Sequence, residues 1–144
     1  LNSALDDINI RIRGDDILAA VGMGQLDQLN ACDSTRAEEH FIAEYSALIE
    51  SFLARPSIKE MYIMAPPPAW EFFGKVRYNI NPDRVKNEIN RATRTLADKY
   101  DLGVIDLYEV FDGKCELFAD GVHPTDKGAK LLAETVYSAV FDKK

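Results

Sequence analysis

Asp120 and His123, near the carboxyl end of the chain, have the types and the spacing of a catalytic pair. They lie in the segment D-G-V-H-P, which is followed by an apolar helical pattern that runs to about Phe141. On a loop that opens a helix, this spacing can place an imidazole against a carboxylate, which fixes the ring tautomer and stabilises the imidazolium formed in general base catalysis. An isolated D-x-x-H is more often an Asx-type turn with a surface histidine, so the rest of the chain has to decide between the two interpretations.

The segment D-G-V-H-P-T ahead of an amphipathic helix resembles the last sequence block of the SGNH (GDSL-type) hydrolases. In that family the Asp and the His of this block serve the nucleophilic serine of an esterase or lipase. The resemblance therefore implies that His123 is the general base and acid of a Ser-His-Asp triad and that Asp120 orients it. It extends over essentially the whole chain but includes only the later blocks of the family.

A second segment, Gly24-Gln25-Leu26-Asp27, follows an apolar run at the point where open α/β sheets place their ligand sites. It corresponds to the G-x-N-D block of SGNH hydrolases, whose Asn donates a hydrogen bond to the oxyanion. Gly24 and Asp27 match, whereas Leu26 stands where the Asn is expected. One such donor contributes on the order of 3 kcal/mol. The resemblance implies an oxyanion or substrate site at Gly24, Gln25 and Asp27, in which Gln25 or Asn30 would have to replace the missing donor.

The periodicity predicts one three-layer α/β/α domain over residues 1–144, with a parallel sheet and right-handed crossovers. Continuous apolar runs indicate strands buried on both faces, and one-face apolar spacing indicates the helices. The predicted strands are 17–23, 61–65 and 103–107; the predicted helices are 3–13, one from a capping box at Thr35 to before Pro56, 82–100, and one ending at about Phe141. The last helix is expected to bury Ala129, Leu132, Ala133, Val136, Tyr137, Val140 and Phe141. The resemblance adds that the fold is of the SGNH-hydrolase, flavodoxin-like type.

The first block of the family, a strand that ends in G-D-S and carries the nucleophilic serine, is not found in these residues. We therefore expect the domain to be incomplete at its amino end and to lack the first strand or strands of the sheet. An upstream segment, a second chain or a rearranged N-terminus is expected to cover strand 17–23, which would otherwise be an unprotected edge. Ser34 follows that strand in the run C-D-S-T, but Asp, Ser and Thr ahead of a helix are more typical of a cap than of a nucleophile.

The segment 69–81, between the second predicted strand and the next helix, is long and aromatic. It contains Trp70, Phe72, Phe73 and Tyr78. Exposed rings would line an acyl or sugar pocket, whereas buried rings would only cover the sheet. The sequence leaves both interpretations open.

Charge and composition exclude several classes of partner. The net charge of -7 and the lack of a basic cluster argue against nucleic acid or an anionic membrane as a partner. No apolar run approaches the roughly 18 residues of a membrane span. The chain has only two histidines, neither of them in a ligand-like spacing, and it has no glycine-rich phosphate loop. We therefore expect neither a metal nor another cofactor. Cys32 and Cys115 are interpreted as thiols rather than as a disulfide framework.

The leading hypothesis is a carboxylic ester hydrolase, an esterase, lipase or acetylesterase, whose substrate is a small-molecule, glycan or lipid ester. The alternative is a catalytically inactive SGNH-fold domain that binds a glycan, a lipid or a protein. Leu26 and the missing nucleophile favour the binding domain, whereas the Asp120/His123 pair favours the enzyme, because a binding domain has no chemical need of it. An unrelated flavodoxin-like module would make the D-G-V-H-P match accidental.

Overall fold

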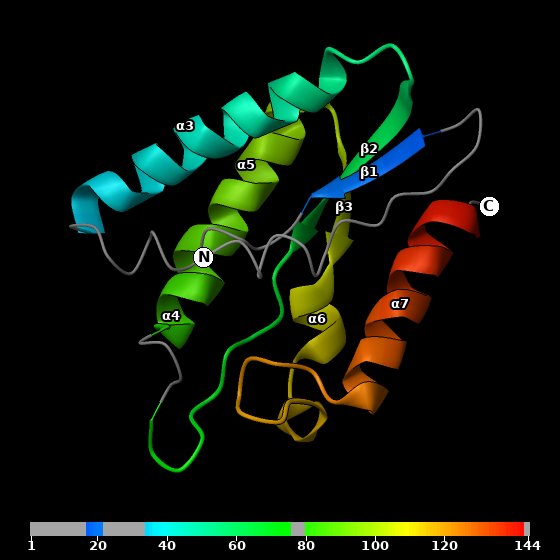
Figure 1. Ribbon diagram of the computed structural model, residues 1–144. Coiled ribbons are helices and arrows are strands. Elements are labelled where there is room, and N and C mark those ends of the chain that lie inside the picture. The colour runs from blue at the N-terminus through cyan, green and yellow to red at the C-terminus, as the bar shows by residue number, and fades with distance from the viewer. Residues whose placement is uncertain (1–16, 22–33, 76–79, 143–144) are drawn as a thin grey trace.

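The computed structural model describes residues 17–21, 34–75 and 80–142 (Figure 1). Its strands are β1 (Ile17–Val21), β2 (Ile58–Ala65) and β3 (Gly103–Asp106). Its helices are α3 (Ser34–Leu53), α4 (Pro82–Arg84), α5 (Asn90–Tyr100), α6 (Leu107–Phe111) and α7 (Asp126–Phe141), with a π-helical turn at Val85–Ile89 and a 3-10 turn at Cys115–Leu117. None of the described helices is long and apolar enough to cross a membrane. The helix predicted at 3–13 lies outside the described residues.

The three strands form one parallel sheet in the order β1-β2-β3. Residues 62–65 of β2 lie opposite residues 103–106 of β3. Each strand is connected to the next through a helical segment, as a parallel sheet requires. The predicted parallel sheet is therefore confirmed for the part of the chain that the structure describes.

The sheet separates two apolar layers, because successive side chains of a strand point to opposite faces. Met61 and Ile63 of β2 pack with buried side chains of α3 and α5, whereas Tyr62 and Met64 pack with buried side chains of α6 and α7. Figure 1 shows α3 and α5 on one side of the sheet and α6 and α7 on the other. This confirms the three-layer α/β/α architecture.

The helix predicted from 82 to 100 is present but is not regular throughout. The side chain of Asn81 caps its start by accepting hydrogen bonds from the N–H groups of Asp83 at 3.0 Å and Arg84 at 3.2 Å. A π-helical turn then separates α4 from α5. The helix ends at Asp101, whose backbone is left-handed with a φ of 54°, and this stop leads directly into β3.

Two boundaries differ from the prediction. β2 begins at Ile58 rather than at Met61. The prediction missed this start because the exposed Lys59 and Glu60 interrupt the apolar pattern of the strand. The stretch after β3, expected to be a loop, contains α6 and the 3-10 turn. Both are too short to produce a helical periodicity in the sequence.

The prediction that Tyr137 and Phe141 are buried in the last helix was wrong. Val136 is buried and Leu132 and Val140 are partly buried against β3 and α6, whereas Tyr137 is 60% exposed and Phe141 is about half exposed. The packed face of α7 is narrower than the apolar stripe of its sequence. Ala129 and Ala133 are exposed as well.

Candidate active site

The segment 118–125, between the 3-10 turn and α7, carries Asp120 and His123 and is closed by backbone hydrogen bonds. The N–H of Ala119 donates to the carbonyl of His123 at 2.8 Å, and the N–H of Thr125 donates to the carbonyl of Leu117 at 2.8 Å. Figure 1 shows this loop, in orange, beyond the end of the sheet where β2 and β3 stop. The loop therefore lies at the carboxyl edge of the strands, where open parallel sheets carry their ligand sites.

Thr125 fixes the loop to α7. Its hydroxyl accepts a hydrogen bond from the N–H of Gly128 at 3.3 Å, which caps the helix, and donates to the carbonyl of Leu117 at 3.1 Å. Gly128 lies so close to Leu117 that a Cβ at this position would overlap the same carbonyl. One end of the loop is thus held by a capped helix and by the turn before it.

Asp120 and His123 are in direct contact. The Nδ1 atom of His123 lies 2.8 Å from Oδ2 of Asp120. The other carboxylate oxygen, Oδ1, accepts hydrogen bonds from the N–H groups of His123 at 2.8 Å and Val122 at 3.2 Å. The carboxyl is 15% exposed and the imidazole 57% exposed. The backbone therefore orients a largely shielded carboxylate, which in turn holds a ring that faces solvent.

These contacts keep Asp120 ionised. Burial raises the pKa of its carboxyl, but the hydrogen bonds from the His123 side chain and from the backbone of His123 and Val122 together outweigh it and lower the pKa to about 2. An ionised carboxylate only accepts hydrogen bonds, so Nδ1 of the neutral ring carries the proton and Nε2 carries the lone pair. This is the tautomer that a general base requires.

Asp120 is expected to make the stability of the fold depend on pH at the acid end. Its folded-state pKa of about 2 lies below the reference value of 3.8, so its contribution is fully present above about pH 4 and is lost as the pH falls through 2. The difference in unfolding free energy between the wild type and Asp120→Asn should therefore shrink by on the order of 2 kcal/mol between about pH 5 and pH 2. Urea unfolding of both proteins across this range measures it, and a constant difference would contradict the assignment.

Gly121 connects the loop 118–125 to the loop that follows β2. Its carbonyl accepts a hydrogen bond from the N–H of Trp70 at 3.0 Å. Its φ of +87° is in the left-handed region, and a Cβ would overlap the carbonyl oxygen of Trp70. Only glycine satisfies both conditions. The D-x-x-H spacing indicated an Asx-type turn in the sequence, but nothing in the sequence indicated the contact of Gly121 with Trp70, far away along the chain.

Gly121→Ala is expected to destabilise the protein more than Gly113→Ala does. Both glycines have a positive φ, but a Cβ on Gly113 meets nothing within 4 Å. The conformational cost alone should give a loss of about 1 kcal/mol for Gly113→Ala, and the added overlap should bring Gly121→Ala to about 3 kcal/mol. Chemical denaturation of the two variants separates these effects. Equal losses would show that the close approach to Trp70 is not tight.

The residues predicted for the oxyanion site, Gly24, Gln25 and Asp27, lie outside the described residues, as do Leu26 and Asn30. Their prediction is therefore neither confirmed nor contradicted. Ser34 is the first residue of α3, one position before the Thr35 predicted as the cap. Its side chain is not among those described.

The described serine side chains lie away from Asp120 and His123. Ser51 and Ser57 flank the turn that enters β2 at its amino end, and Ser138 lies in the last turn of α7, which runs away from the loop. Ser46 is buried in α3, where its hydroxyl accepts a hydrogen bond from Lys99 at 3.4 Å. None of these described positions is suited to the nucleophile.

The aromatic residues of the loop after β2 divide into two groups. Trp70 packs on Phe118, with ring centroids 4.7 Å apart, and belongs to the core on the α7 side of the sheet. Phe72 and Phe73 are exposed, by 45% and 94%. The structure thus combines the two interpretations, because the first ring covers the sheet and the next two face solvent. Tyr78 lies outside the described residues.

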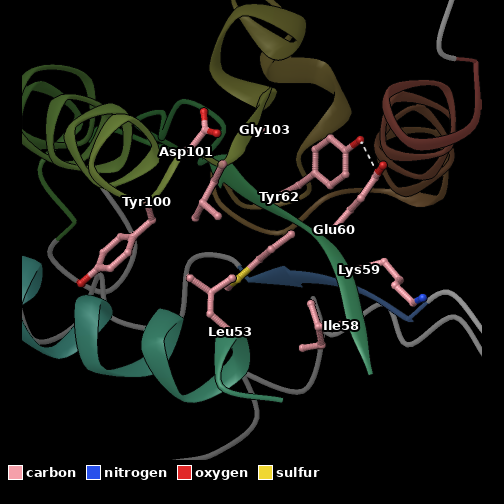
Figure 2. Close-up of a pocket in the computed structure, with 10 residues that line it drawn as sticks. Leu53, Ile58, Lys59, Glu60, Tyr62, Tyr100, Asp101 and Gly103 are labelled. Carbon is pink, nitrogen blue, oxygen red and sulfur yellow. Dashed lines mark hydrogen bonds between the residues drawn. The ribbon is translucent and has the colours of Figure 1, made fainter. Parts of the chain in front are cut away.

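A hollow of about 280 Å³ lies at the opposite edge of the sheet, around the amino ends of β2 and β3. Figure 2 shows Tyr62 and Glu60 in it, joined by a hydrogen bond of 3.2 Å. Leu53, Ile58 and Tyr100 line another side. Because Asp120 and His123 lie at the carboxyl edge, this hollow is separate from them. In the described part of the chain no cluster of three or more His, Cys, Asp or Glu side chains is arranged to hold a metal ion.

The sequence profile of the GDSL-like Lipase/Acylhydrolase family matches residues 8–136. An acetylxylan esterase of Xylanibacter ruminicola is 34% identical over 89 residues, which are 60% of this chain and 18% of that protein. The chain thus spans about a fifth of the length of this relative.

Solved structures agree with the family match. The crystal structure of the acetyl xylan esterase AlAXEase superposes with a TM-score of 0.64 at 25% identity, over 88% of this chain and 67% of the other. A putative acylhydrolase from Bacteroides fragilis superposes with a TM-score of 0.65 at 16% identity, over 89% of this chain and 62% of the other. The second similarity is one of fold, and together they identify the three-layer domain as that of the SGNH hydrolases.

Proposed function

The chain belongs to the family of GDSL-like lipases and acylhydrolases, and from this membership we propose that the protein hydrolyses carboxylic esters with His123 as general base and acid and Asp120 as the residue that orients it. The observation that carries the proposal is the 2.8 Å contact between Nδ1 of His123 and Oδ2 of Asp120. With the carboxylate ionised, this contact keeps the ring proton on Nδ1 and the lone pair on Nε2, the atom that has to accept the proton of the nucleophile.

In the proposed reaction a serine hydroxyl attacks the ester carbonyl while Nε2 of His123 takes its proton. The tetrahedral intermediate then collapses, the C–O bond of the alcohol breaks, and the imidazolium returns the proton to the leaving alkoxide. Water attacks the acyl-enzyme in the same way, with Nε2 again as the base, and releases the acid and the free serine. Asp120 stabilises the imidazolium in both steps and stays ionised throughout.

For the substrate we propose an acetyl ester carried by a glycan. Support comes from the two relatives whose names state an acetyl xylan substrate. An acetyl group is small, so hydrolysis does not require a deep acyl pocket. For the oxyanion site we propose Gly24, Gln25 and Asp27, with backbone N–H groups as the donors in place of the asparagine that Leu26 replaces.

The test is labelling of the purified protein with a fluorophosphonate, which forms a covalent bond only with an activated serine. We expect one adduct by intact-mass spectrometry in the folded protein and none after heat denaturation. Peptide mapping then identifies the labelled serine and shows whether Ser34, whose position is more typical of a helix cap, is the nucleophile. If the folded protein forms no adduct and hydrolyses no acetyl ester, the proposal is wrong and the inactive binding domain replaces it.

A further inference from the structure

The tip of the loop after β2 is a tight hairpin of four residues, Phe72-Phe73-Gly74-Lys75. The N–H of Phe72 donates to the carbonyl of Lys75 at 2.8 Å, and the N–H of Lys75 donates back to Phe72 at 3.2 Å. Phe73 and Gly74 have φ angles of 52° and 73°. Two central residues with positive φ are the mark of a type I′ turn, which strongly favours Asn-Gly or Asp-Gly.

Phe73 is therefore an unfavourable residue for this turn. A phenylalanine with positive φ is strained by its own Cβ. Burial does not offset that strain, because the side chain is 94% exposed and its ring packs edge to face on the neighbouring Phe72, with the centroids 4.7 Å apart. Asparagine at this position would suit the fold better. The stability of the described structure gives no reason for an aromatic ring here.

The hairpin lies beside the catalytic loop. Trp70, two residues before it, donates its N–H to the carbonyl of Gly121 at 3.0 Å, and the Cβ of Phe72 lies 3.8 Å from the position that a Cβ on Gly121 would occupy. Gly121 directly follows Asp120. Figure 1 shows both loops beyond the same end of the sheet. The exposed rings therefore belong to a loop whose backbone is hydrogen-bonded to the loop that carries Asp120 and the proposed base His123.

We propose that Phe73, supported by Phe72, is a stacking platform for a sugar ring of a polymeric glycan whose ester is presented to His123. This inference rests on the proposed function and specifies how its substrate is held. An acyl chain requires a concave apolar pocket that removes it from water, whereas a ring at the tip of a hairpin presents its faces to solvent. Such an open face suits the C–H face of a sugar within a chain that lies across the surface.

A lipid surface is the other partner that an exposed aromatic pair would fit. Membrane-binding segments combine aromatic residues with basic ones that attract anionic headgroups. Glu71 precedes the pair and Lys75 and Arg77 follow it, so this segment has an excess of only one positive charge, within a chain whose net charge is -7. The charge therefore favours the neutral, hydroxyl-rich glycan.

The test is affinity electrophoresis in native gels that contain soluble acetylated xylan, which reports binding without requiring turnover. We expect the wild type to be retarded, and Phe73→Asn to bind about fivefold more weakly through loss of the stacked ring. Phe73→Tyr, which keeps the ring, should bind like the wild type. Phe141→Asn removes an exposed aromatic residue from the far end of α7 and should leave retardation unchanged. Thermal unfolding of Phe73→Asn should match or exceed the wild type, because Asn-Gly suits the turn.

The outcomes separate this inference from the proposed function. Equal retardation of the wild type and Phe73→Asn, or no retardation of either, would overturn the platform even if fluorophosphonate labels the protein. Retardation that depends on Phe73 in a protein that forms no adduct would uphold the platform and reject the hydrolase. Binding to phosphatidylcholine vesicles that depends on Phe73, with no retardation by xylan, would overturn the glycan in favour of a lipid surface.

Discussion

Replacing His123 with alanine is expected to lower kcat for ester hydrolysis by about a thousandfold or more. Without the imidazole the proposed base, which takes the proton from the nucleophile and returns it to the leaving alkoxide, is lost. The effect should fall on kcat and on kcat/KM alike, because the ring acts on the transition state rather than on ground-state binding. Initial rates with 4-nitrophenyl acetate and with acetylated xylan measure it.

Lys127→Ala is the matched control for this loss. Lys127 is an exposed residue in the first turn of α7, next to the loop that carries Asp120 and His123, so its truncation tests whether any shortened side chain in this region reduces the rate. We expect its kcat to stay within about twofold of the wild type. The imidazole is 57% exposed, so circular dichroism and thermal unfolding of His123→Ala should resemble the wild type. A folded His123→Ala protein with an unreduced rate would reject His123 as the base.

The architecture could be predicted from the sequence because it depends on hydrophobic patterns that extend over many residues. Apolar runs interrupted by helical stripes specify alternating strands and helices, and a parallel sheet follows from that alternation. The carboxyl edge of such a sheet is also where the D-G-V-H-P segment had to lie if it was functional. Three strands and the three long helical segments, α3, α4 through α5, and α7, were placed correctly within a few residues.

The errors arose where tertiary packing overrides local pattern. Tyr137 and Phe141 continue the apolar stripe of α7, yet the helix packs through a face centred on Val136, and no periodicity reports how wide that face is. The exposed Lys59 and Glu60 concealed the start of β2. Ile58 pairs with Ile17 and Glu60 with Leu18, so the strand continues through Lys59, where the register shifts, regardless of these side chains.

The candidate site divides in the same way. Asp120 and His123 are close in sequence, so their contact depends on a local turn that the D-x-x-H spacing encodes. The contact between Gly121 and Trp70 joins two loops that come together only when β2 and β3 pair. The exposure of Phe73 likewise depends on the hairpin turn. The sequence places Trp70 and Phe73 in the same aromatic segment, yet Trp70 is packed and Phe73 is exposed.

Asp120→Asn is expected to lower kcat by about a thousandfold or more while leaving the loop folded. The amide oxygen of asparagine can still accept the N–H groups of Val122 and His123, as Oδ1 does now. Its NH₂ group then faces Nδ1 and donates to it, which moves the ring proton to Nε2. The lone pair is therefore on the wrong nitrogen, and a serine protease triad altered in this way loses about 10⁴ in kcat.

Asp126→Asn is a suitable control because it makes the same chemical change at an exposed position in the first turn of α7. It removes only a favourable charge at a helix amino end, which costs about 0.5 kcal/mol of stability and leaves the imidazole untouched. Its kcat should stay within about twofold of the wild type.

NMR of the ring nitrogens gives an independent readout, since Asp120→Asn should shift the protonated nitrogen from Nδ1 to Nε2. If the tautomer changes and the rate does not, proton transfer does not pass through His123. If neither changes, the carboxylate does not determine the tautomer, and its contact with the ring is only the packing of a turn.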